Sequence, residues 1–262
     1  MMVPCATMFP QASMIRRRPS PVGSDVMAIR QMALTPSLVA QIHRVVEDPG
    51  PDPNVVYHTE EDYDALVRHL LLSHRPDQDL WLFAYGSLIW KPEVDHIEER
   101  IGTAHGWHRA FRLRITRWRA SADQPGLMMG LDRGGQCRGA LFRITAPSVE
   151  ENLGKLVRRE MSAKPPTNVA RWIRVETNMG PVRALAFALN RKGRVYAGKL
   201  SPEETAGLLA RACGHWGSCA EYLHNTVMHL EERGIHDSNL WRLQALVAER
   251  IKAASSGCSP IP

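Results

Sequence analysis

The spacing of apolar residues predicts two helices in the N-terminal third of the chain. Residues 34–48 have helical spacing after Thr35, and Pro36 falls at the first helical position, where its missing N–H is tolerated. Residues 59–74 repeat the arrangement, with Thr59 as the N-cap and acidic side chains in the first turn. We therefore expect a short helical region ahead of the main body of the fold.

The pattern from residue 80 to residue 145 favours β-strands instead. Apolar and basic residues alternate in the run FRLRI (residues 111–115), which is the period of a half-buried strand. Two apolar segments flank RGGQ (residues 133–136), and this arrangement predicts a hairpin. Residues 168–189 predict two more strands, which the sequence NMGP joins.

One helix interrupts the strands, and three more helices end the chain. The middle helix is predicted over residues 148–161, with Ser148 and Glu151 as a capping box. The final helices begin at Ser201, Ser218 and Asp237, the first two with a glutamate three residues later. Strands and helices do not alternate regularly, so the expected fold class is α+β: a small mixed β-barrel or curled sheet with helices packed outside.

The stretch WLFAYGSLIWKP (residues 81–92) begins as a buried strand and is broken by Gly86 and Ser87. The ordinary interpretation of such a break is a turn. The alternative is a site, because backbone N–H groups that leave a strand ladder can point at a carbonyl or carboxylate of a ligand.

A glutamate occupies an apolar position of the middle helix. With about 100° per residue and Val149 at zero, Leu153, Leu156 and Val157 fall at about 40°, 340° and 80°. Glu160 falls at about 20°, the centre of this apolar stripe. A carboxylate there requires a partner or a proton. It is either a buried ion pair, or the last turn of a helix that swings into solvent, or a desolvated general base with a raised pKa.

Composition narrows the class of protein without identifying it. The net charge of +6, from 33 basic and 27 acidic residues, permits binding to anions but does not require it. The five cysteines form no CxxC pair, which is typical of reduced thiols and predicts a cytoplasmic protein. An apolar run of about 18 residues, which a membrane span would need, is missing from the sequence.

The first 30 residues differ in composition from the rest. They contain Arg16, Arg17 and Arg18 and have no acidic residue before Asp25, which resembles a transit peptide. A basic amphipathic stripe is missing, however, so we favour a disordered extension, with translation from Met27 or Met32 as a variant of this interpretation. The predicted organisation is therefore an extension (1–30), a helical segment (31–79), a catalytic domain (80–250) and a flexible tail (251–262).

Most familiar catalytic motifs are missing from the sequence, including glycine-rich nucleotide loops and HExxH. His105 and His108 form an HxxH pair without a third ligand, so we expect no metal site. Cys137 lies in a predicted strand and is expected to be a small core residue. The basic stretch of residues 105–119 contains interleaved aromatic residues and leaves a nucleic-acid-binding module as an alternative, although a solvated strand face explains it better.

Three features together resemble one family. They are YGSLIW (residues 85–90) after an apolar strand, Glu160 at the end of a helix, and GSCAEYLHNTVMHLEERGIHDSNLWRL (residues 217–243). In combination they resemble the ChaC-like γ-glutamylcyclotransferases over residues 80–247. The resemblance implies the fold of that family, a small mixed β-barrel with surrounding helices.

The resemblance also implies an activity, namely cleavage of glutathione to 5-oxoproline and cysteinylglycine without cofactor or metal. Glu160 matches the catalytic acid/base, and Tyr222 falls where a tyrosine could line the pocket. The residues matching the loop that holds the γ-glutamyl group are Tyr85, Gly86, Ser87, Leu88, Ile89 and Trp90. Other γ-glutamyl amino acids or γ-glutamylamines remain alternative substrates, and oligomeric state is left open. Arg112 or Arg114 could attract the carboxylates of glutathione.

This chemistry needs few protein groups. The α-amine of a γ-glutamyl peptide attacks the γ-carbonyl of the same residue, and such tethering is worth an effective molarity of about 10⁵ M or more. The enzyme must hold the substrate folded, stabilise an oxyanion and move protons. A free glutamate titrates about 4 units below an α-amine, a difference of about 5 kcal/mol per proton transfer. Burial of Glu160 would close part of that gap.

Overall fold

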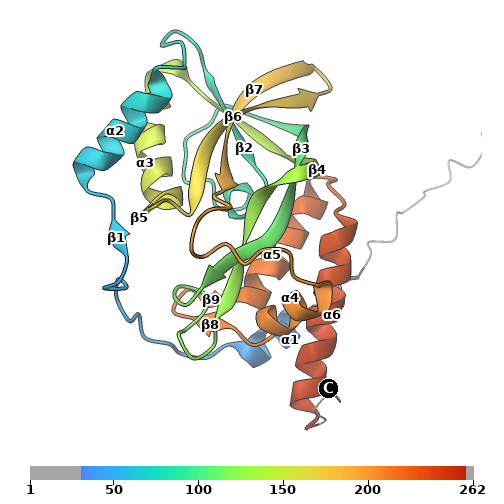
Figure 1. Ribbon diagram of the computed structural model, residues 1–262. Coiled ribbons are helices and arrows are strands. Elements are labelled where there is room, and N and C mark those ends of the chain that lie inside the picture. Colours follow the sequence, from blue (N-terminus) through green and yellow to red (C-terminus); the bar gives the residue numbers. More distant parts are fainter. Residues whose placement is uncertain (1–30, 258–262) are drawn as a thin grey trace, which may run out of the picture. The chain divides into compact units, whose positions relative to one another are not determined.

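The computed structural model describes residues 31–257 (Figure 1). The expectations for residues 1–30 and for the end of the predicted tail lie outside this range. The helices are α1 (Pro36–Ile42), α2 (Glu60–Leu71), η1 (Ser87–Ile89), η2 (Ala146–Ser148), α3 (Val149–Glu160), α4 (Pro202–Leu209), α5 (Cys219–Glu232) and α6 (Ser238–Ser255). The strands are β1 (Val56–Tyr57), β2 (Leu80–Ala84), β3 (Glu98–Ile115), β4 (Gly126–Ile144), β5 (Ala163–Lys164), β6 (Asn168–Thr177), β7 (Gly180–Leu189), β8 (Cys213–Gly214) and β9 (Gly217–Ser218).

The central element is a closed barrel with the strand order β2-β4-β3-β6-β7. Neighbouring strands are antiparallel except where β7 meets β2 and β4, and the parallel pairing of Trp81 with Ala184 helps to close the barrel. This confirms the predicted α+β class and the mixed β-barrel. Phenylalanines 83, 142 and 187 from three of the strands are fully buried.

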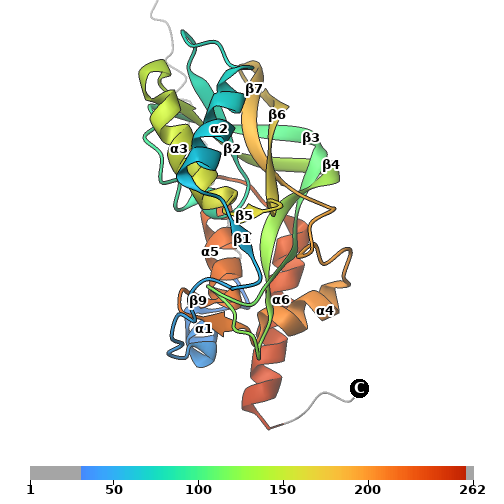
Figure 2. The ribbon, with the colours of Figure 1, turned by 60° about the vertical axis from the view of Figure 1, so that its left-hand side comes forward.

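Helices cover the barrel in two groups. In Figure 1, α2 and α3 lie side by side against one flank, while α1, α4, α5 and α6 gather near the other end of the long strands β3 and β4. Figure 2 shows the same grouping from a second direction. Helix α5 also contacts η1 and β4, and this contact brings the C-terminal region to the end of β2.

The predicted hairpin at residues 133–136 is wrong, because β4 runs through this sequence without reversing. Gly134 and Gly135 have φ values of +103° and +67°, which favour glycine. They lie at a register shift between β3 and β4, where His105 pairs with Gln136 and Trp107 pairs with Arg133. The glycines therefore make a bulge in one long strand rather than a turn between two. The turn predicted at NMGP does connect β6 to β7.

The predicted helix caps had mixed outcomes. Thr59 and Ser201 form the expected caps, each as a complete capping box with an acidic residue three positions later. The capping box of Ser148 and Glu151 is wrong. Ser148 ends η2 with φ −99° and ψ 0°, and this conformation directs its hydroxyl away from the helix, so that it accepts from Thr145 instead.

Several helix boundaries also differ from the prediction. Helix α1 ends at Ile42 rather than near residue 48, and α2 ends at Leu71. Asp237 caps α6 as expected, with its carboxylate accepting from two backbone N–H groups, but α6 continues to Ser255, past residue 250. No helix within residues 31–257 is both long enough and apolar enough to cross a membrane.

Candidate active site

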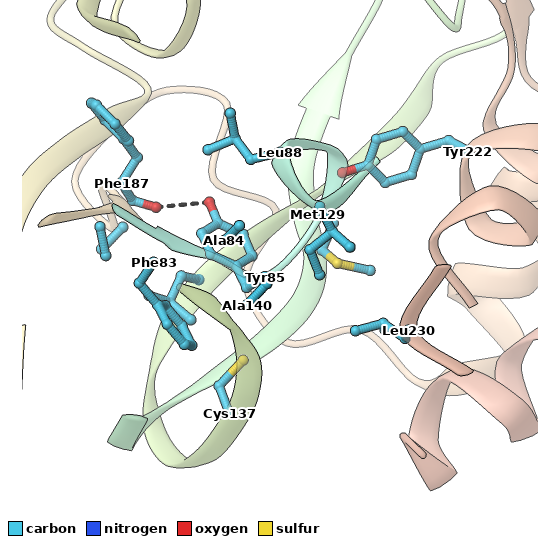
Figure 3. Close-up of a cluster of buried hydrophobic side chains, with 14 of the residues drawn as sticks. Phe83, Ala84, Tyr85, Leu88, Met129, Cys137, Ala140, Phe187, Tyr222 and Leu230 are labelled. Carbon is cyan, nitrogen blue, oxygen red and sulfur yellow. Dashed lines mark hydrogen bonds between the residues drawn. The ribbon is translucent and has the colours of Figure 1, made fainter. Parts of the chain in front are cut away.

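The loop that follows β2 leaves the barrel and turns immediately into η1. Tyr85 still belongs to the barrel core, since its side chain is buried and its hydroxyl donates to the backbone oxygen of Phe187 at 2.7 Å (Figure 3). Leu88 and Ile89 are also buried, at 4% and 1% exposure, and anchor η1 in the hydrophobic core. These three residues fix the loop, and Gly86, Ser87 and Trp90 form the part of it that meets α5.

Gly86 allows a close approach between the loop and Tyr222. A Cβ atom at this position would lie 2.9 Å from the Tyr222 hydroxyl and 3.5 Å from the sulfur of Met129. Figure 3 shows the Tyr222 ring entering from α5 with its hydroxyl directed at this loop. A side chain at this position would collide with the Tyr222 hydroxyl, so the close approach requires glycine.

The backbone N–H of Ser87, expected from sequence to be available for a ligand, donates to the Tyr222 hydroxyl oxygen at 3.2 Å. The N–H groups of Gly86 and Leu88 have no acceptor within the described part of the chain. The Tyr222 hydroxyl uses a lone pair for Ser87, which leaves its hydrogen available for another acceptor. The loop and Tyr222 therefore carry hydrogen-bond donors that are not used by the fold itself.

Aromatic rings and one cation surround this hydroxyl. The Tyr222 ring centroid lies 5.9 Å from that of Trp90 and 6.0 Å from that of Phe111, both edge to face. The guanidinium carbon of Arg119 lies 5.7 Å from the Tyr222 ring and 5.9 Å from the Trp90 ring. Arg119 also binds Glu221 at 2.7 Å, so it is held in place as a positive charge beside the site.

Glu160 lies at the C-terminal end of α3 with its side chain 15% exposed. The helical pattern that placed it on the buried face was correct, since Leu153, Leu156 and Val157 are all in the core. Burial raises the pKa of Glu160, the neighbouring Arg159 opposes the rise, and the charge of Glu93 adds to it. The carboxylate is therefore poised as a stronger base than an exposed glutamate.

Glu160 also raises the pKa of two buried tyrosines. For both Tyr85 and Tyr222 the main cause is burial, and the negative charge of Glu160 contributes further. The structure thus brings Glu160, the predicted acid/base, near both Tyr85 of the loop and Tyr222 of α5.

Arg159 links this carboxylate to the loop. Its Nε lies 3.2 Å from the carboxylate of Glu160, and its Nη2 donates to the Ser87 hydroxyl at 3.1 Å. The same guanidinium donates to the backbone oxygen of Lys91 at 2.5 Å and pairs with Glu93 at 3.0 Å. One side chain therefore connects the end of α3 with both ends of η1. The sequence pattern did not single it out, because an arginine next to a glutamate is unremarkable there.

Asn168, the first residue of β6, is a second residue that the sequence did not indicate. Its side-chain Nδ2 donates to the backbone oxygen of Glu160 at 3.3 Å and to the carboxylate at 3.4 Å. No signal in the sequence marks it, since the contact depends on how β5 and the following turn return the chain to the end of α3.

The basic stretch of residues 105–119 is largely neutralised by acidic partners. Arg112 binds the buried carboxylate of Asp132, and Arg117 binds Asp48 at 2.7 Å. Arg112 is therefore already engaged, and the positive charge that this stretch offers to nucleic acid or to the carboxylates of glutathione is reduced.

Residues 31–257 contain no group of three or more metal-ligating side chains. Cys137 is buried as expected, and burial raises the pKa of its thiol.

The closed mixed barrel and its surrounding helices match a known fold. A yeast γ-glutamylcyclotransferase specific to glutathione has the same fold, with a TM-score of 0.59 at 19% identity over 66% of this chain and 96% of that chain. The family model described as ChaC-like protein matches residues 80–250. The chain belongs to the ChaC-like family, as its sequence predicted.

Curated relatives support this assignment. A glutathione-specific γ-glutamylcyclotransferase of Escherichia coli (strain K12) is 36% identical over 171 residues, which are 64% of this chain and 73% of the relative. Glutathione-specific γ-glutamylcyclotransferase 1 of Danio rerio is 29% identical over 178 residues, which are 66% of this chain and 91% of the relative.

Proposed function

We propose that this protein is a γ-glutamylcyclotransferase that cleaves glutathione to 5-oxoproline and cysteinylglycine. The observation that carries the proposal is the placement of one desolvated carboxylate, Glu160, opposite a loop with unpaired backbone donors. Membership in a family whose curated relatives are named for this activity supports the choice of glutathione.

The reaction requires proton transfer in both directions at two nitrogens. The substrate α-ammonium loses two protons as the nitrogen attacks the γ-carbonyl and becomes the lactam N–H. The nitrogen of the cysteinyl residue gains two protons as its bond to the γ-carbonyl carbon breaks and it leaves as an ammonium. A single carboxylate that accepts from the first nitrogen and donates to the second is sufficient, and Glu160 is assigned this role.

The remaining groups hold the substrate folded and stabilise charge. The Tyr222 hydroxyl and the N–H groups of Gly86 and Leu88 would donate to the oxyanion of the tetrahedral intermediate. Trp90, with the Arg119 guanidinium beside its ring, would form a wall of the γ-glutamyl pocket. Ring closure within one substrate residue removes the need for a protein nucleophile.

The decisive experiment uses the Glu160→Gln variant, which keeps the size and an acceptor oxygen but cannot exchange protons. Wild-type protein incubated with glutathione, without ATP or metal, is expected to release 5-oxoproline. The variant is expected to lose about 10²- to 10⁴-fold in kcat with an unchanged fold, which circular dichroism checks. Near-wild-type turnover by the variant would remove Glu160 from the mechanism. A parallel assay with γ-Glu-Ala tests whether glutathione is preferred.

A further inference from the structure

The carboxamide of Asn168 is buried against Glu160, with the residue only 8% exposed. Its nitrogen donates to two oxygens of Glu160, at 3.3 Å and 3.4 Å. The backbone oxygen of Glu160 can accept but never donate, so this contact fixes the nitrogen end of the carboxamide toward α3. The oxygen end, Oδ1, must therefore point elsewhere.

The Oδ1 atom is buried and has no hydrogen-bond partner among residues 31–257. A buried acceptor without a donor costs about 1–3 kcal/mol, and most buried polar atoms avoid this. Asn168 already satisfies its nitrogen, so the unpaired oxygen is not explained by the fold. Its position beside the carboxylate of Glu160 suits a ligand group that donates hydrogen bonds and carries a positive charge.

We propose that Asn168 Oδ1 accepts a hydrogen bond from the α-ammonium of the γ-glutamyl substrate, next to Glu160. The proposal rests on the proposed function and adds a substrate-binding residue to it. An ammonium has three donors, and a single carboxylate leaves its rotation about the C–N bond free. A second acceptor holds the nitrogen in one orientation, which aligns it with the γ-carbonyl for attack. The proposal also predicts that the site selects ligands with an α-amine.

The test compares two ligands that differ only in that amine. The ligands are glutathione and glutaryl-cysteinylglycine, which lacks the α-amine, and calorimetry gives Kd for each. The measurements use the Glu160→Gln background, where turnover is blocked and the glutamine keeps an oxygen for the Asn168 nitrogen. Adding Asn168→Ala should raise the Kd of glutathione about 10- to 100-fold, which is the effect of losing a hydrogen bond to a charged group. The Kd of the glutaryl ligand should change by less than about threefold.

The proposal would be overturned if Asn168→Ala raised the Kd of both ligands equally, or of neither, because a purely structural role of Asn168 does not distinguish the two ligands. Asn168→Asp provides a second variant if the alanine protein unfolds early in a thermal melt. It keeps an acceptor oxygen, so the preference for glutathione over the glutaryl ligand should survive, and its loss would also overturn the proposal.

Asn190 offers a matched control. It is a half-buried carboxamide on the loop after β7, and it donates to the backbone oxygen of Pro166 at 2.9 Å. Asn190→Ala should leave the ratio of the two dissociation constants unchanged. Failure of the wild-type protein to release 5-oxoproline from glutathione would contradict the proposed function, whereas an unchanged ratio of the two dissociation constants in Asn168→Ala would contradict only the present inference.

Discussion

The hydroxyl of Tyr222 is the group whose removal separates folding from catalysis most cleanly. Its oxygen accepts from the Ser87 N–H at 3.2 Å, while its ring is 2% exposed and packs between Phe111 and Trp90. Tyr222→Phe keeps this ring packing and deletes only the oxygen. Any change in stability or rate therefore reports on the hydroxyl.

Two magnitudes follow from this geometry. The Ser87 N–H loses its partner, which costs about 1–3 kcal/mol of folding free energy if water does not replace the hydroxyl. For a chain of this size each kcal/mol lowers Tm by about 2–4 °C. If the hydroxyl hydrogen also stabilises the oxyanion, kcat should fall about 100-fold or more, as for the loss of one oxyanion donor in other enzymes.

The assay measures 5-oxoproline release at saturating glutathione, together with a thermal melt of the same sample. Tyr196→Phe is a matched control, because the Tyr196 hydroxyl donates to the buried carboxylate of Asp132 at 3.0 Å and not to a residue of the candidate site. The control should lose stability but not kcat. If Tyr222→Phe lowers Tm and keeps kcat within about threefold of wild type, the hydroxyl only fastens the loop and the reasoning about the oxyanion fails.

Three further changes test other parts of the site. Gly86→Ala places a Cβ 2.9 Å from the Tyr222 hydroxyl, so kcat for 5-oxoproline release should fall about 10-fold or more with an intact fold, and an unchanged kcat would contradict the need for close approach. Arg159→Gln removes the cation that lowers the pKa of Glu160, so the acid limb of kcat/KM against pH should move to higher pH; a stationary limb would contradict this coupling. Asp132→Asn tests stability: burial of this 1% exposed carboxylate acts to raise its pKa, but hydrogen bonds from Arg191, the Arg133 backbone N–H and Arg112 outweigh it and lower the pKa from 3.8 to about 2. This corresponds to about 2 kcal/mol of stability, present above pH 3.8 and lost as pH falls through about 2, so urea unfolding at pH 7 should show a loss that disappears in acid.

Local rules predicted much of the fold because they act over three or four residues. The caps at Thr59 and Ser201 depend only on an extended residue followed by an acid, and both formed. Ser148 failed because η2 ran directly into α3, and a neighbouring element decides that conformation. The glycines at residues 134 and 135 adopt positive φ, but whether a strand reverses or bulges there depends on its pairing with β3.

The site was predictable where periodicity placed a residue and hidden where distant segments met. Glu160 could be found because a charged side chain in an apolar helical stripe is unusual. Asn168 reaches the same carboxylate only because the chain returns from α3 to β6, and no local pattern records that path. The use of the Ser87 amide by Tyr222, 135 residues away, was hidden for the same reason.

In the proposed reaction Glu160 serves as both base and acid, and the contacts of Arg159 suit that double role. Burial alone would raise the pKa of Glu160, and a glutamate that stays protonated cannot accept a proton from the substrate ammonium. The Arg159 guanidinium, 3.2 Å from the carboxylate, opposes this rise in pKa and favours the ionised form of Glu160. The pKa nevertheless stays raised, so the carboxylate keeps part of the basicity that burial gives it. Because the same guanidinium binds the Ser87 hydroxyl at 3.1 Å, the loop position and the charge state of Glu160 are coupled. In the proposed mechanism, a loop that moved away from Arg159 would therefore change the protonation of Glu160 as well as the binding of the γ-glutamyl group.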